Sequence, residues 1–169
     1  MKKQFICASL CLALLSSALV TSCGSDVVST AEYSIDNTAT ELTAAVNAVL
    51  PVSSELAAPD PALTMAMFGD AAEHFETFSV LTNASGMTQD EYGIFKVDAD
   101  ENVAAVETAI KSYLADKLAA FTGDYTPEEK PKLENATVKI FGRFVVYCIL
   151  SEENTELVMT TVENTLLGK

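Results

Sequence analysis

The chain has 169 residues, of which 24 are acidic and 10 are basic, so its formal net charge at pH 7 is −14. So acidic a chain is poorly suited to neutralising phosphates, which argues against a nucleic-acid partner, and an anionic bilayer surface repels it. The length suits one domain with a substantial core.

Residues 1–22 are typical of a bacterial lipoprotein signal peptide. Lys2 and Lys3 form a positive start, residues 5–20 are largely apolar, and small or polar residues then lead to Cys23. The apolar run is shorter than the roughly 20 residues that a membrane-spanning helix needs. We therefore predict cleavage before Cys23, with an uncleaved signal anchor as the alternative. Both outcomes place the rest of the chain outside the cytoplasmic membrane.

Cys23 is the predicted acceptor of lipid, with palmitate among its acyl chains. Cleavage removes two basic residues, so the mature chain keeps eight against 24 acidic ones and carries a net charge of −16. Residues 23–36, which include this lipidated N-terminus, are rich in small polar residues and are predicted to form a flexible tether. We expect the protein to lie at the extracytoplasmic face of the cell membrane, held by several acyl chains on Cys23.

We expect residues 37–169 to form a single α+β domain. Capping signals and apolar residues at spacings of three and four predict its helices, and alternating or β-branched runs predict its strands. The expected helices begin near Thr38, Pro61, Val103 and Ser151, and the expected strands cover residues 75–83, 92–97, 136–141 and 143–150. One more helical turn is expected at residues 126–129, where Pro131 prevents its extension.

These elements follow the order α-α-β-β-α-β-β-α. That order indicates a four-stranded antiparallel sheet with helices packed mainly on one face. Residues 143–150 are apolar on both faces, so we expect this strand, which includes Cys148, to be central in the sheet. The β-β-α unit occurs twice, which suggests an old duplication.

Several short motifs carry a resemblance to a known family. They are Tyr92-Gly-Ile-Phe-Lys-Val97, Tyr125-Thr-Pro-Glu-Glu129 and Leu133-Glu-Asn-Ala136, together with the amphipathic helix, the hairpin and the final helix around them. In order and spacing they resemble the domain of unknown function 4358 family of bacterial lipoproteins, over roughly residues 38–167. The resemblance implies a small secreted or lipid-anchored protein without an assigned activity, and it supplies no catalytic residues.

A histidine and three carboxylates lie close together in the sequence, at Asp70, Glu73, His74 and Glu76, and His74 is the only histidine of the chain. A metal centre needs more ligands than this cluster offers, and the chain has no His-Glu-x-x-His motif. We therefore expect no metal and no cofactor, and we interpret the cluster as a solvated turn between a helix and a strand. Neither a nucleophile elbow nor a glycine-rich phosphate loop is present.

Tyr92, Phe95, Tyr125 and Asn135 are the candidate recognition residues. The simpler interpretation is that the aromatic rings fill the core and that Asn135 closes a turn. The alternative is a recognition patch in which Tyr125, Pro127 and Asn135 line one rim of the domain, because aromatic and Asn side chains make adaptable contacts.

Two functions from different classes remain open. The absence of a catalytic motif favours a binding or interaction module of the cell envelope, whose partner is an envelope protein or another ligand. The alternative is a carboxylate-dependent extracytoplasmic hydrolase, in which two of the 24 acidic residues, with or without His74, perform the chemistry.

Overall fold

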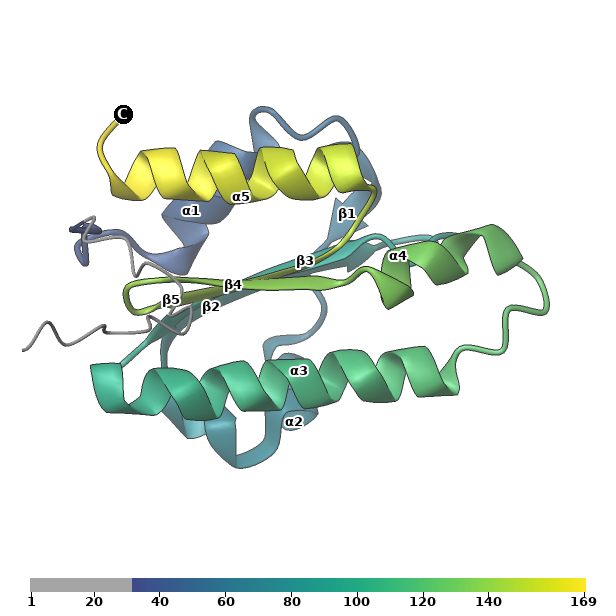
Figure 1. Ribbon diagram of the computed structural model, residues 1–169, viewed down its shortest axis with the longest axis horizontal. Coiled ribbons are helices and arrows are strands. Elements are labelled where there is room, and N and C mark those ends of the chain that lie inside the picture. The colour runs from purple at the N-terminus through teal and green to yellow at the C-terminus, as the bar shows by residue number, and fades with distance from the viewer. Residues whose placement is uncertain (1–31) are drawn as a thin grey trace, which may run out of the picture. The chain divides into compact units, whose positions relative to one another are not determined.

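The computed structural model describes residues 32–169 (Figure 1). The predicted signal peptide, Cys23 and most of the predicted tether lie outside the described residues. The chain divides into two units, residues 1–30 and residues 31–169, and the fold below is that of the second unit. Among the described residues, no helix has both the length and the apolar character that crossing a membrane requires.

The second unit is built on an antiparallel sheet of five strands in the order β1-β2-β3-β5-β4. The strands are β1 (Leu56–Ala57), β2 (Phe75–Asn83), β3 (Glu91–Val97), β4 (Thr137–Phe141) and β5 (Phe144–Ile149). The prediction of an antiparallel α+β sheet is confirmed, but the prediction of four strands is wrong. The additional strand, β1, has two residues, too few to show an alternating pattern.

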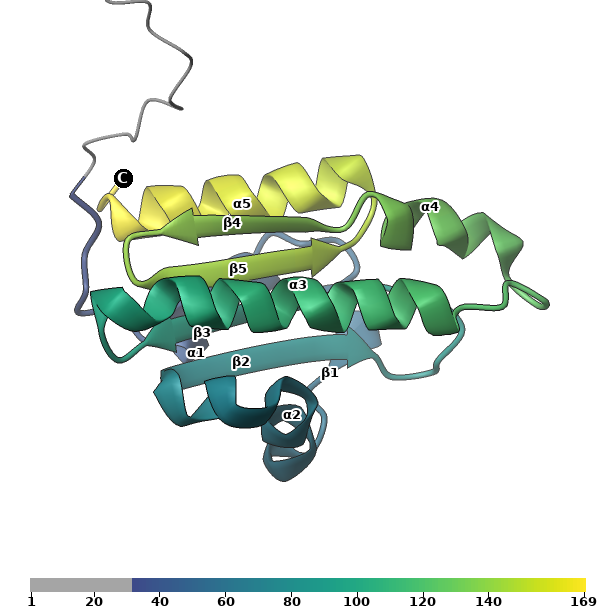
Figure 2. The ribbon, with the colours of Figure 1, turned by 60° about the horizontal axis from the view of Figure 1, so that its bottom comes forward.

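Helices cover both faces of this sheet, so the prediction of helices mainly on one face is also wrong. Helices α1 (Ala39–Asn47) and α5 (Glu152–Leu166) lie over one face, and α2 (Pro61–Phe68) and α3 (Val103–Ala120) lie over the other (Figures 1 and 2). A short helix, α4 (Lys130–Glu134), precedes β4, and the expectation that Pro131 prevents extension of the turn is wrong, because Pro131 lies in the first turn of α4, where a missing N–H is tolerated. The element order therefore differs from the expected one by β1 and α4.

The two central strands explain the three-layer arrangement. Every residue of β3 and of β5 is buried, so each strand needs a covering layer on both of its faces. Tyr92, Ile94 and Val146 pack into one core with α1 and α5. Phe95 and Tyr147 pack into a second core with α2 and α3. The sheet thus separates two apolar cores.

Local signals in the sequence fix most of the helix ends. Thr38 and Glu41 form the predicted capping box of α1, with the Glu41 amide donating to Thr38 Oγ1 at 3.2 Å. Ser151 caps α5, and Gly69 ends α2 at a φ of 54°. Before α3, the chain forms a 3₁₀ turn over Asp100–Asn102, and no side chain caps the helix.

The two β-β-α units are mirror images in their connections. Strands β3 and β5 are antiparallel neighbours, with β2 and β4 on their outer sides. The helix that follows β3 covers one face and the helix that follows β5 covers the other. A half-turn about the normal to the sheet exchanges β3 with β5, but it leaves each face of the sheet on its own side. It would therefore place the helix that follows β3 on the wrong face, and no rotation superposes the two units. The suggested duplication therefore has no support from the topology.

Candidate functional site

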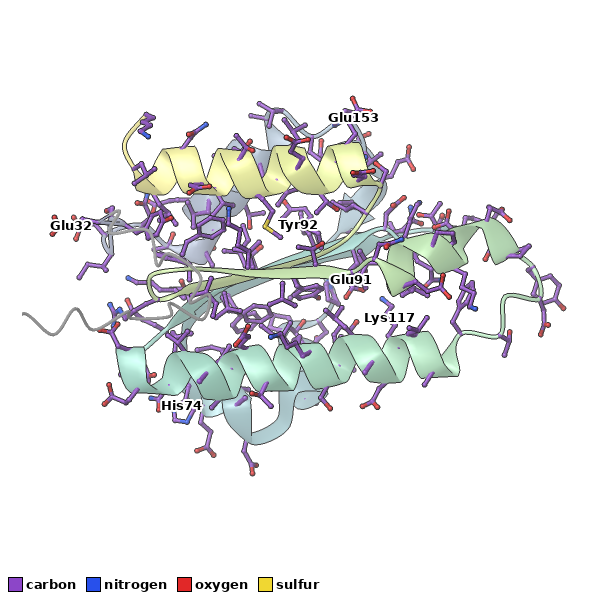
Figure 3. All side chains as sticks on the ribbon, viewed as in Figure 1. Glu32, His74, Glu91, Tyr92, Lys117 and Glu153 are labelled. Atoms are coloured by element: carbon purple, nitrogen blue, oxygen red, sulfur yellow. The ribbon has the colours of Figure 1, made fainter. Side chains whose placement is uncertain are left out.

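One end of the sheet gathers three of the four buried charged residues in the described part of the chain, Asp90, Glu91 and Glu129, whereas Lys96 lies toward the other end. Here β2 ends, β3 begins at Glu91, β5 ends, and the last turns of α3 lie beneath the sheet (Figure 3). The side chain of Glu91 is the centre of this cluster. It is 1 % exposed although it carries a carboxylate. Carboxylates are almost never fully buried unless they are paired.

Three side chains surround the Glu91 carboxylate. The hydroxyls of Tyr113 and Tyr147 both donate to Glu91 Oε1 at 2.7 Å, and Lys117 Nζ donates to Oε2. Lys117 Nζ also lies 3.4 Å from the Tyr113 hydroxyl oxygen. The charge of Glu91 is therefore balanced by one ammonium group, and two hydroxyls hold the carboxylate in place.

A glycine allows the Tyr147 ring to reach Glu91. Gly93 and Tyr147 are directly opposite each other on β3 and β5. A Cβ atom at position 93 would overlap the Tyr147 ring and lie 2.9 Å from Cε2 of Phe95. The missing side chain lets the ring lie across β3 toward the carboxylate two residues away, which gives Gly93 a packing role rather than a turn role.

Both tyrosines of the cluster are held in their protonated form. Burial, and after it the negative charge of Glu91, raises the pKa of Tyr113 and of Tyr147 well above the ordinary value. At neutral pH they are hydrogen-bond donors to the carboxylate. The cluster Glu91–Tyr113–Lys117–Tyr147 is therefore held in place by hydrogen bonds among its own members. We call it the buried support.

A second ionic group lies next to this support. Lys132 Nζ donates to Asp90 Oδ1 at 2.8 Å and to Glu129 Oε2 at 2.9 Å, and the Gln89 amide donates to Glu129 Oε2 at 2.7 Å. Burial lowers the pKa of Lys132, but the hydrogen bonds to Asp90 and Glu129 outweigh burial and raise it. These contacts fasten the loop before β3 to α4.

Three cavities open at this end of the domain. The largest, of about 640 Å³, lies where α4 meets the start of β4 and the start of α5, and its lining includes Asn135, Thr137 and Thr155. The second has about 330 Å³ and the third about 190 Å³. Gln89 and Lys117 line both of the smaller ones, so the buried support forms part of their walls.

The structure places the residues of the predicted recognition patch on either side of α4. Tyr125 is 97 % exposed and lines the second cavity. Asn135 lines the largest cavity, and its Nδ2 donates to the Pro131 carbonyl at 2.8 Å. Pro127 begins the 3₁₀ turn that leads into α4. The two cavities are distinct, and a recognition role for these three residues stays a prediction.

The simpler interpretation holds for two of the three aromatic residues. Tyr92 and Phe95 are fully buried, and the Tyr92 hydroxyl donates to Asn47 Oδ1 at 2.8 Å. The expectation that Tyr125 fills the core is wrong, because it lies in the segment between α3 and α4 with its ring in solvent.

The cluster around His74 lies at the opposite end of the domain (Figure 3). His74 Nδ1 is 3.6 Å from Asp98 Oδ2, and Glu76 pairs with Lys96 at 2.6 Å and with Arg143 at 3.5 Å. Asp70 and Glu73 are exposed in the turn before β2. Within residues 32–169, no three side chains of the metal-binding types gather as a cation site would require.

The buried support was missed in the sequence. Tyr113 fits the apolar stripe of its helix, and Glu91 belongs to no motif. One signal is present in the sequence, because Glu91 stands directly before the strand pattern of residues 92–97. Tyr113 and Lys117 also stand at the spacing of four that places two side chains on one helix face.

The N-terminal end of the described chain lies away from these cavities. Figure 3 shows Glu32 at the end of the domain opposite to Glu91 and Lys117. The Ser34 amide donates to the Leu166 carbonyl at 2.9 Å, which ties this end to the last turn of α5. The first described residues therefore lie at the end of the domain remote from the cavities.

A family model described as "Domain of unknown function (DUF4358)" matches residues 61–150. The match runs from α2 to the end of β5, so it includes the whole buried support and leaves α1 and α5 outside. Comparison with curated proteins and with solved structures gives no match.

Proposed function

The chain belongs to the DUF4358 family, and we propose that it serves as a binding module of the cell envelope, held at the extracytoplasmic face of the membrane by lipid on Cys23. The family name assigns no activity, so the proposal is supported by the cavities and by the N-terminal sequence.

The largest cavity is the observation that carries this proposal. Its volume of about 640 Å³ is within the range typical of ligand sites. Hydroxyl, amide, ammonium and carboxylate groups line it beside the apolar Leu150 and Pro131. It opens at the end of the domain remote from Glu32, which leaves it accessible when the chain is held at its N-terminal end.

The carboxylates of the described residues give less support to the alternative of a hydrolase. Glu91 is buried, and both of its oxygens accept hydrogen bonds from neighbouring side chains. Glu152 and Glu156 do line the largest cavity, but they stand one turn apart on a single helix. Glycoside hydrolysis uses two carboxylates that flank the bond from different sides, and these two approach a ligand from the same side.

Thermal unfolding with candidate ligands tests the binding function. We expect a sugar, a peptide or a cell-wall fragment to raise the melting temperature of the full chain, because a ligand that binds only the folded state stabilises it. Thr155→Trp, which fills the largest cavity, should abolish the rise. Thr160→Trp places the same ring on an exposed part of the same helix and should preserve it. If no ligand raises the melting temperature and cross-linking in membranes captures no partner, the proposal is wrong.

Metabolic labelling with a fatty acid tests the anchor. The unaltered chain should incorporate label and remain with membranes, and Cys23→Ser should lose both properties because the acceptor thiol is gone. Cys148→Ser is the matched control, because that thiol is buried in β5. Label that persists in Cys23→Ser would contradict the anchor.

A further inference from the structure

Strand β4 forms an open edge of the sheet within residues 32–169. The turn Gly142-Arg143 joins it to β5, with Phe141 opposite Phe144. The residues that flank a two-residue turn bond to each other, and bonded pairs then alternate along the hairpin. The backbone groups of Val138 and Ile140 therefore point away from β5. The Val97 amide donates to the Arg143 carbonyl at 2.9 Å. Arg143 therefore bonds toward β3, as expected if alternate residues of β5 bond to β3 and to β4.

An apolar groove runs along this edge on the α3 side. It has a volume of about 240 Å³, and mostly aliphatic side chains line it: Leu114, Ala115, Leu118, Leu133, Ala136 and Val138, with Lys111 at one end. Ile140 follows Val138 on the same face of β4 and is 38 % exposed although it is aliphatic. The side chains of the open strand and of α3 thus leave apolar surface uncovered beside unpaired backbone groups.

The other side of the same edge is polar, and its lining holds two carboxylates as well as the Lys132 ammonium group, which is already paired with Asp90 and Glu129. The cavity of about 640 Å³ lies between the start of β4 and α5, with Thr137 contributed by the strand and Glu152 and Glu156 by the helix. In Figure 1, β4 crosses the front of the domain between α5 and α3. The open strand is therefore flanked by an acidic cavity on one side and an apolar groove on the other.

We propose that an extended peptide binds as an additional strand on the outer edge of β4. Its backbone pairs with Val138 and Ile140, its apolar side chains enter the groove beside α3, and its basic side chains face Glu152 and Glu156. The alternation of side chains along a strand matches the two different walls, so the partner is a segment that alternates apolar and basic residues. This inference rests on the proposed binding function and names its partner class.

Two features distinguish this edge from the rest of the sheet. Lys139, the charged residue of β4, has its Nζ 3.1 Å from Glu163 Oε2 and 4.6 Å from the centre of the Phe141 ring. Its charge is thus directed over the α5 face of the sheet. Lysines on edge strands often hinder the pairing of another strand, but Lys139 does not lie at the open backbone edge. On the opposite side of the sheet, β1 pairs only with Thr82 and Asn83 of β2, so the apolar groove next to β4, and not the open edge alone, is what the peptide uses.

Fluorescence anisotropy with synthetic peptides tests the proposal on the full chain in detergent. The probe is a labelled peptide of about ten residues that alternates Val and Lys. We expect it to bind, and we expect at least about tenfold weaker binding when Glu replaces Lys, because Glu152 and Glu156 then repel it. A peptide of the same composition with its Lys and Val residues in two blocks should also bind at least about tenfold more weakly.

Two pairs of variants locate the contact. Val138→Pro removes an outward N–H and leaves the bonds to β5, so we expect about a tenfold loss of affinity. Glu156→Lys should weaken binding, whereas Glu153→Lys, on the same helix but outside the cavity lining, should leave it nearly unchanged. If Val138→Pro does not fold, the comparison of Glu156→Lys with Glu153→Lys decides.

Each remaining outcome overturns the inference in a distinguishable way. If no peptide binds but another ligand raises the melting temperature and Thr155→Trp abolishes the rise, the peptide inference fails and the binding function stands. If nothing binds, both fail. If sedimentation shows a dimer that Val138→Pro dissociates, a second copy of the chain occupies the edge and the peptide inference is wrong.

Discussion

Glu91 is a carboxylate held where water hardly reaches it. It is 1 % exposed, and its three partners come from two elements: Tyr113 and Lys117 from α3 and Tyr147 from β5. Removing a charged group from water is costly, and the opposite charge and the two hydroxyls offset that cost only as long as all of them are present. The site is therefore sensitive to the loss of any one member.

Glu91→Ala should be strongly destabilising. The change leaves Lys117 without its counter-ion and the Tyr147 hydroxyl buried without an acceptor, so we expect the free energy of unfolding to fall by roughly 3–5 kcal/mol. Urea unfolding followed by circular dichroism measures the change. Glu107→Ala is the matched control, because its pair with Lys111, at 2.7 Å, lies on the helix surface and contributes about 0–1 kcal/mol. Equal effects of the two changes would contradict the role given to Glu91.

Stability should fall in alkaline solution. Unfolded tyrosines lose their protons near pH 10, whereas Tyr113 and Tyr147 keep theirs in the folded state because their pKa is raised. Rising pH thus favours the unfolded state once it passes about 10, with no effect well below that value. Urea unfolding between about pH 8 and pH 11 measures this loss.

The variant Tyr147→Phe isolates one contribution to that loss. It removes one buried hydroxyl, so its stability should fall less steeply above about pH 10, by up to roughly 1.4 kcal/mol per pH unit. Val145→Ala, which truncates another buried side chain of β5 but has no titrating group, should keep the slope of the unaltered chain. An unchanged slope in Tyr147→Phe would show that its proton is not retained by the fold.

At the scale of elements, β4 should show an alternating pattern of hydrogen exchange. The amides of Lys139 and Phe141 bond to β5, whereas those of Val138 and Ile140 face outward. We expect the outward pair to exchange much faster, because exposed amides need no opening of the sheet. Amide exchange followed by NMR measures this at single residues, and uniform protection along β4 would mean that the edge is already covered.

Local chemistry made most elements predictable from the sequence. The capping box of α1, the proline that opens α2, the glycine of the hairpin and the apolar stripe of α3 each depend on neighbours within a few residues. The expected layer arrangement differs from the structure although one signal for it is present in the sequence. Residues 143–150 are apolar on both faces, which predicts a central strand and equally implies a helix layer on each side of the sheet.

The buried support depends on contacts that sequence spacing does not reveal. Glu91 meets Tyr113 across 22 positions and Tyr147 across 56 positions. The β3–β5 register and the missing side chain of Gly93 create the contact with Tyr147, and both are properties of the folded sheet. The exposure of Tyr125 likewise depends on where the segment after α3 leads, because its composition alone suits a core residue.

At the scale of the whole molecule, self-repulsion should lower stability. The chain carries a net charge of −14, and like charges in a compact state repel one another. We expect added NaCl to raise the melting temperature, because ions screen surface charges more effectively than buried pairs. Differential scanning calorimetry from low to moderate salt measures this. Glu153→Lys, which reduces the net charge at an exposed site, should show a smaller rise; a fall with salt would mean that attractive pairs dominate.

The contacts of Tyr33 and Ser34 also set how the domain responds to mechanical load. The Tyr33 hydroxyl donates to Glu163 at 3.1 Å, its ring meets Phe141 at 5.7 Å, and Ser34 bonds to Leu166. If the chain is anchored at Cys23 as proposed, a pulling force from the N-terminal side acts on these contacts before it acts on the sheet. Once these contacts are broken, residues 32–38, which precede α1, would extend to a length of about 20–25 Å.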